Sequence, residues 1–102
     1  MVYMPGFRWE NIDASEKIGV RLLSLSRKLL PRSHKKSTIY FYLYRGKVEF
    51  RSSEKTTIID QDDLIRIKSG TTYEILNLGG SEPAVLLEIS IPPTTPQDTT
   101  FK

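Results

Sequence analysis

The sequence predicts an all-β domain, and three observations lead to that prediction. No long stretch keeps the apolar spacing of three and four residues that an amphipathic helix requires. Several short runs instead alternate with period two, or are continuously apolar and β-branched. Turn residues separate these runs at intervals of about 8 to 12 residues, the spacing of a meander of short antiparallel strands. The pattern therefore predicts a sandwich or a barrel.

Seven segments have the composition of strands, because each combines β-branched, aromatic or aliphatic residues with an alternating pattern. In chain order they are residues 17–26 (KIGVRLLSLS), 37–46 (STIYFYLYRG), 47–52 (KVEFRS), 55–60 (KTTIID), 63–68 (DLIRIK), 72–79 (TYEILNLG) and 84–90 (AVLLEIS). Seven strands are enough for either architecture.

The breaks between these segments contain residues that favour turns. Gly46 follows Arg45 between two predicted strands, and glycine allows the positive φ of a tight hairpin. Residues 61–63 and 69–70 supply further turns, and residues 79–83 form a looser connection.

Length and composition indicate one domain, which we place at residues 1–91 of the 102 in the chain. Residues 92–102 (PPTTPQDTTFK) have little to bury, so we expect a short disordered C-terminal tail. The chain has no cysteine, which excludes disulfides and thiolate metal sites and is compatible with a reducing compartment. No apolar run approaches the roughly 18 residues of a membrane span, so we expect no membrane contact.

Residues 62–77 (DDLIRIKSGTTYEILN) resemble the second conserved motif of cupin domains, in which a glycine is followed by proline, glycine, histidine and asparagine. The spacing matches throughout: Asp62 stands at the first glycine, Lys68 at the proline, Gly70 at the second glycine, Tyr73 at the histidine and Asn77 at the asparagine. This resemblance implies a cupin-like double-stranded β-helix, which is a jelly-roll barrel.

The first cupin motif, two histidines and a glutamate before a turn glycine, can be placed on residues 33–46 with Gly46 as that glycine. Ile39 occupies the glutamate position, and only His34 can serve as a histidine. A catalytic first-row metal needs about three nitrogen or oxygen ligands. We therefore expect no metal, no other cofactor and no catalytic residue, so that the chain is not an enzyme. His34 should be an exposed surface residue.

Within the cupins, both motifs are similar to those of the C-terminal domain of centromere protein C, the kinetochore scaffold. In that family the second motif resembles PxGNxYxIxN, where this chain reads KSGTTYEILN, and the passage YFYLYRGKVEF resembles FYVLxGxVEV. The resemblance implies a nuclear, centromere-bound homodimer. It also implies a protein partner, either a kinetochore component or a loading factor for the centromeric histone.

The motif positions predict which side chains face into the barrel. The residue at the cupin glutamate position points inward, and alternation extends this to its neighbours. The predicted inner pocket consists of Ile39, Phe41, Leu43, Tyr73, Ile75 and Asn77. Two interpretations stay open: a packed core in which the Tyr73 hydroxyl has an internal partner, or a cavity that accepts a partner's side chain.

The same alternation places Tyr40, Tyr42 and Tyr44 on the outer face of their strand. Tyrosine is typical of interface hot spots, because it combines a large apolar ring with a polar tip. We predict that these three residues form a dimer interface. The alternative is that an N-terminal strand covers them within one chain, through Trp9, Ile18, Val20 or Leu22.

Basic residues are unevenly distributed, with nine between Lys17 and Val48 and no acidic residue there. The predicted basic patch is Arg27, Lys28, Arg32, Lys35 and Lys36. Such a patch can make weak, nonspecific and salt-dependent DNA contacts, or can be an ordinary solvated face.

An alternative function is a metal-free cupin that binds a small molecule, as a sugar isomerase or a sensor. An isomerase needs a general base, usually histidine with a carboxylate, and no acidic residue is expected to face inward. The sensor alternative remains open.

Overall fold

The structure is a computed structural model that describes residues 6–101, and in this range it consists of strands and turns without a helix. The strands are β1 (Phe7–Ala14), β2 (Gly19–Leu25), β3 (Lys28–His34), β4 (Thr38–Arg45), β5 (Lys47–Ser52), β6 (Thr56–Asp60), β7 (Leu64–Ile67), β8 (Tyr73–Asn77), β9 (Ala84–Ile91) and β10 (Thr99–Phe101).

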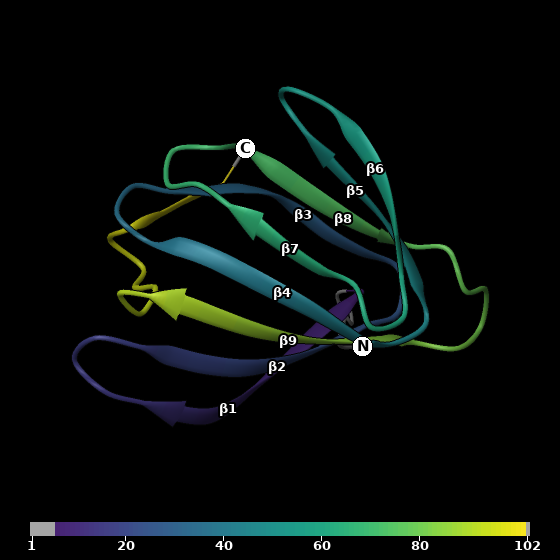
Figure 1. Cartoon of the computed structure of the whole chain (residues 1–102), viewed down its shortest axis with the longest axis horizontal. Helices are drawn as coiled ribbons and strands as arrows, with labels where there is room; N and C mark the ends of the chain where they lie inside the picture. Colours follow the sequence, from purple (N-terminus) through teal and green to yellow (C-terminus); the bar gives the residue numbers. More distant parts are fainter. Residues whose placement is uncertain (1–5, 102) are drawn as a thin grey trace, which may run out of the picture.

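The strands form two five-stranded sheets with the orders β1-β2-β9-β4-β7 and β10-β3-β8-β5-β6. We call them sheet A and sheet B. Figure 1 shows β7, β4, β9 and β2 of sheet A side by side, with β1 at the edge. The pairings are antiparallel, and consecutive strands such as β2 and β3 pass from one sheet to the other. This is a jelly-roll arrangement, which confirms the all-β prediction.

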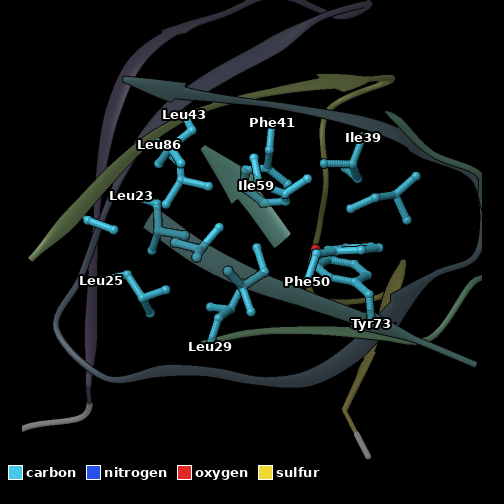
Figure 2. Packing of buried hydrophobic residues seen from close by; sticks show 14 residues of the cluster. Leu23, Leu25, Leu29, Ile39, Phe41, Leu43, Phe50, Ile59, Tyr73 and Leu86 are labelled. Atoms are coloured by element: carbon cyan, nitrogen blue, oxygen red, sulfur yellow. The ribbon is translucent and has the colours of Figure 1, made fainter. Parts of the chain in front are cut away.

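The core lies between the two sheets and consists of fourteen buried apolar side chains (Figure 2). They are Leu23, Leu25, Leu29, Ile39, Phe41, Leu43, Val48, Phe50, Ile59, Ile67, Tyr73, Ile75, Ala84 and Leu86. Burial alternates along β4, β8 and β9, so each strand contributes every second side chain. Each large aliphatic side chain contributes about 1.5 to 3 kcal/mol by leaving water.

All seven predicted strands are present, but β1, β3 and β10 were not predicted. β3 contains Pro31 within a basic segment, and proline removes a backbone donor from a strand. The structure accommodates Pro31 at a register shift between Leu29 and Arg32 in the pairing of β3 with β8. β1 contains no proline, but beyond Trp9 it is mostly polar and exposed, so its pattern is weak.

The segment after Ile91 returns to the barrel where the structure describes it. Thr99–Phe101 pair with β3 as strand β10. Asp98 is buried, and its carboxylate accepts hydrogen bonds from the backbone of Lys36 and the hydroxyl of Ser37 at 2.6 and 2.9 Å. Lys102 lies outside the described residues. The flexibility of residues 92–102 in solution stays a prediction.

The turns adopt the conformations that the motif requires. Gly46 has a φ of 103°, and a Cβ added there would lie 3.1 Å from the Cα of Ala84, so both conformation and space favour glycine. Asp62 and Gly70, which stand at the two glycine positions of the second motif, have φ values of 75° and 83°. Aspartate is one of the few residues that tolerates such a backbone.

Candidate functional site

The three tyrosines of β4 lie on the outer face of sheet A, on the side opposite to the core. Tyr40 and Tyr42 are half-buried by their neighbours, and Tyr44 is 57% exposed. The Tyr42 hydroxyl donates a hydrogen bond to the carboxylate of Asp62. This bond, followed by burial, raises the pKa of Tyr42. The phenol is therefore neutral and held in place at neutral pH.

The strand register extends the tyrosines into apolar rows that cross the sheet, and we call these rows the outer apolar face. One row contains Val20, Ile89 and Tyr40 and ends on Arg66 of β7. The next contains Leu22, Leu87, Tyr42 and Leu64. Directly opposite side chains on neighbouring strands have Cβ atoms about 5 Å apart, so the members of a row touch. Leu64 is 60% exposed at the end of its row.

The N-terminal strand does not cover the outer apolar face. β1 pairs with the edge of β2, with Trp9 opposite Leu23, and Trp9 packs against the core. Val20 and Leu22 belong to the same outer face as the tyrosines and extend it. The outer face of sheet B differs in character, since Glu74 forms ion pairs there with Lys28 and Arg51. The apolar surface is thus concentrated on sheet A.

Tyr73 lies in the packed interior, as Figure 2 shows. Its ring stacks on Phe50 at 5.8 Å between centroids and meets the edge of Phe41 at 6.1 Å. Ile39, Phe41, Leu43 and Ile75 are buried in the same core. Asn77 is different: its amide donates to the carbonyls of Ser26 and Glu82, so it organises loops instead of facing the pocket.

His34 is buried, so the expectation that it is a surface residue is wrong. Its Nε2 lies 2.9 Å from the Tyr73 hydroxyl, and its Nδ1 lies 3.0 Å from the hydroxyl of Thr99. Burial, only partly opposed by the Asp98 carboxylate, lowers the pKa of His34 from its ordinary 6.5 to about 4. The imidazole is therefore uncharged at neutral pH. Burial likewise raises the pKa of Tyr73.

Glu88 also faces inward, which corrects the expectation that no acidic residue does so. Its side chain is fully buried and accepts two hydrogen bonds from Arg21, at 2.8 Å from Nε and 3.1 Å from Nη2. The Arg21 guanidinium also lies 3.8 Å from the centroid of the Trp9 ring. The alternating pattern of residues 84–90 could have identified Glu88, because it shares the parity of Leu86 and Ala84.

These polar groups line or adjoin a cleft of about 390 Å³ at the mouth of the barrel. We call it the mouth cleft. The lining comes from β1, β2, β3, β10 and the segment that precedes β10. Its described lining residues are Phe7, Trp9, Arg21, Arg32, His34, Thr94, Thr95, Pro96, Thr99 and Phe101.

The five residues of the predicted basic patch do not gather on one surface. Arg27 and Lys28 lie at the start of β3 and Lys35 and Lys36 just after its end, which separates them by roughly 25 Å at about 3.3 Å per residue. Arg32 is buried and lines the mouth cleft. Weak, nonspecific DNA contact stays a prediction.

Within residues 6–101, no group of three or more histidine and acidic side chains is arranged to hold a metal ion. In the same range there is also no helix of the length and hydropathy needed to cross a membrane.

Comparison with known proteins gives a likeness of fold. No protein-family model and no curated protein matches the sequence. Among solved structures, Streptomyces PAC13 with uridine has a TM-score of 0.84 at 16% identity, covering 95% of this chain and 78% of that one. The Schizosaccharomyces pombe Cnp3 cupin domain has a TM-score of 0.79 at 16% identity, covering 88% and 67%. KdgF from Halomonas sp. has a TM-score of 0.80 at 13% identity, covering 91% and 86%.

These likenesses confirm the cupin-like double-stranded β-helix and correct one functional expectation. Pac13 is a nucleoside dehydratase, so a fold similar to this one supports enzymatic activity. The prediction that this chain is not an enzyme is therefore wrong, because this fold does not exclude enzymatic activity. The loss of the metal ligands from the cupin motifs concerns only metal-dependent chemistry, so it was too narrow a reason for that exclusion.

Proposed function

We propose that this chain is a homodimerisation and protein-recruitment module of a centromere scaffold, with the outer apolar face of sheet A as its self-association surface. One observation supports this most directly. Apolar side chains are aligned in two rows across β2, β9 and β4, and one of these rows continues to exposed Leu64 on β7. An exposed apolar sheet face of this kind is typical of an interface.

A second copy of the chain is the occupant that fits this face. Two such faces related by a two-fold axis would bring each row against its mate, giving an isologous contact. A stable interface of ordinary size buries about 1,600 Å² in total. Tyrosines at its centre would supply large rings, while the Tyr42 hydroxyl keeps its hydrogen bond to Asp62.

The sequence motifs support the centromere as the place of action. KSGTTYEILN and YFYLYRGKVEF resemble the corresponding motifs of centromere protein C, and the likeness to the Cnp3 cupin domain adds support. Dimerisation would strengthen attachment of a parent scaffold by avidity, because two linked copies bind together. In the nucleus, the recruited partner would be a kinetochore component or a loading factor for the centromeric histone.

The first test introduces a charge at the centre of the outer apolar face. Leu87 lies between Leu22 and Tyr42, so Leu87→Lys would place an unpaired ammonium group in the dimer contact. We expect sedimentation equilibrium to give a dimer for the unmodified chain at micromolar concentration and a monomer for Leu87→Lys.

The matched control is Ile58→Lys, an exposed aliphatic position on the outer face of sheet B opposite Glu49. It should remain dimeric. A monomeric unmodified chain would contradict dimerisation itself. If Leu87→Lys is still a dimer, the interface does not lie on the outer apolar face.

The proposed location has its own test. The chain fused to a fluorescent protein should colocalise with the centromeric histone in cells.

A further inference from the structure

Arg32 is a buried cation in the mouth cleft that forms no ion pair within residues 6–101. Its side chain belongs to a residue only 5% exposed, and its Nε donates to the carbonyl of Leu30 at 3.1 Å. The ion pairs formed within residues 6–101 involve other side chains and leave Arg32 without a carboxylate. A cation that has lost most of its water and has no ion-pair partner is costly, so a bound anion would stabilise it.

The neighbouring carboxylates are already occupied. Glu88 accepts hydrogen bonds from Nε and Nη2 of Arg21. Asp98 accepts hydrogen bonds from Lys36 and Ser37. His34 has a pKa of about 4 because of burial and carries no charge at neutral pH. Arg32 is thus the local charge that a bound anion could neutralise.

Aromatic rings surround this guanidinium. Its central carbon lies 4.9 Å from the centroid of the Phe101 ring and 5.4 Å from that of Phe7. Trp9 and the hydroxyls of Thr94 and Thr99 complete the nearby lining. A cleft of about 390 Å³ falls within the range of small-molecule sites, about 300 to 1,000 Å³.

We propose that the mouth cleft binds a small ligand that bears a carboxylate and a flat ring. The carboxylate would pair with the free Nη groups of Arg32, and the ring would pack against Phe7 and Phe101. A guanidinium presents two parallel donors to a carboxylate, which makes this pairing directional as well as charged. The site is separate from the outer apolar face, so the inference goes beyond the proposed dimer.

The experiment titrates the whole chain with benzoate and follows the backbone amide resonances of Arg32, Thr99 and Phe101 by NMR. Benzamide is the control that has the ring but no charge. Inorganic phosphate is the control that has a negative charge but no ring. We expect saturable shifts with benzoate, and affinities at least tenfold weaker for both other probes. Benzoate shifts that do not saturate, or benzamide that binds equally well, would overturn the proposal. Phosphate binding as tight as that of benzoate would leave only a general anion site and reject the ring-bearing ligand.

Two variants test whether Arg32 provides the positive charge that binds the carboxylate. Arg32→Met should weaken benzoate binding at least tenfold, whereas Arg8→Met, exposed on β1, should leave it unchanged. In the absence of ligand, Arg32→Met should unfold at the same temperature as the unmodified chain or at a higher one, because it removes a buried charge. Undiminished binding by Arg32→Met would refute the assignment. The comparison of benzoate with benzamide uses the unmodified chain, so it decides the outcome even where a variant does not fold.

Discussion

At the scale of single residues, the buried His34 makes the stability of the fold depend on pH. Its ring is held between the hydroxyls of Tyr73 and Thr99 in a site that disfavours its charged form. Unfolding exposes the imidazole and restores its ordinary affinity for protons. Protonation of His34 therefore favours the unfolded chain.

We predict a loss of stability on acidification that depends on His34. Because the pKa falls from 6.5 to about 4 on folding, the contribution is complete above about pH 6.5 and is lost as the pH falls toward 4. Between pH 7 and 4.5, the free energy of unfolding should fall by about 2 kcal/mol more for the unmodified chain than for His34→Gln. Urea unfolding at a series of pH values measures this. Equal falls for both proteins would show that His34 does not carry the effect.

At the scale of elements, β10 and the residue before it close one side of the mouth cleft. The Asp98 carboxylate holds the turn between β3 and β4, and its backbone carbonyl accepts from the amide of Lys35 at 2.8 Å. Burial raises the pKa of Asp98, but the hydrogen bonds from Ser37 and Lys36 outweigh this effect and keep the pKa below its ordinary value. The ionised carboxylate thus ties the C-terminal segment to the barrel.

Removal of this carboxylate should loosen β10. We expect Asp98→Ala to lower the free energy of unfolding by about 1 to 3 kcal/mol, because the amide of Lys36 and the buried hydroxyl of Ser37 lose the carboxylate that accepts from them. Hydrogen exchange should quicken at Lys35 and Thr99–Phe101. Gln97→Ala, at an exposed neighbouring position, should change neither quantity. Fast exchange of these amides already in the unmodified chain would instead support the flexible tail that the sequence predicts.

At the scale of the whole molecule, the two sheets present different outer surfaces, and the basic residues do not form one continuous patch. The outer face of sheet A is apolar across β2, β9 and β4, and sheet B carries ion pairs such as that between Lys28 and Glu74, 3.1 Å apart. A net charge of +3 remains, distributed over distant positions. This arrangement suits a protein contact on sheet A better than a nucleic-acid contact along β3.

DNA binding should accordingly be weak and strongly dependent on salt. We expect fluorescence anisotropy with a labelled duplex to detect binding at about 50 mM salt and none at about 150 mM, because contacts that only neutralise phosphates are lost as salt rises. Lys35→Ala with Lys36→Ala should reduce the residual binding, and Lys55→Ala should not. Sequence-selective binding that persists at the higher salt would contradict this view.

Local sequence pattern was enough to predict β2, the strands from β4 to β9, and the inward and outward faces of β4. Alternation of apolar residues along STIYFYLYRG is a local property, so it placed Ile39, Phe41 and Leu43 inward without knowledge of the rest of the chain. The turn positions of Gly46 and Asp62 followed from the motif spacing for the same reason.

The contacts between the polar groups in and beside the mouth cleft could be seen only in the tertiary structure. His34 and Tyr73 are 39 residues apart, and Arg21 and Glu88 are 67 apart. Their contacts depend on the order of strands in the two sheets and on the closure of the barrel, which no local pattern records. β3 carries His34 and Arg32 but contains a proline and basic residues, so the sequence suggested an exposed segment. β3 pairs with β8 and β10, and this pairing fixes which of its side chains face the interior. His34 and Arg32 lie on that inner face.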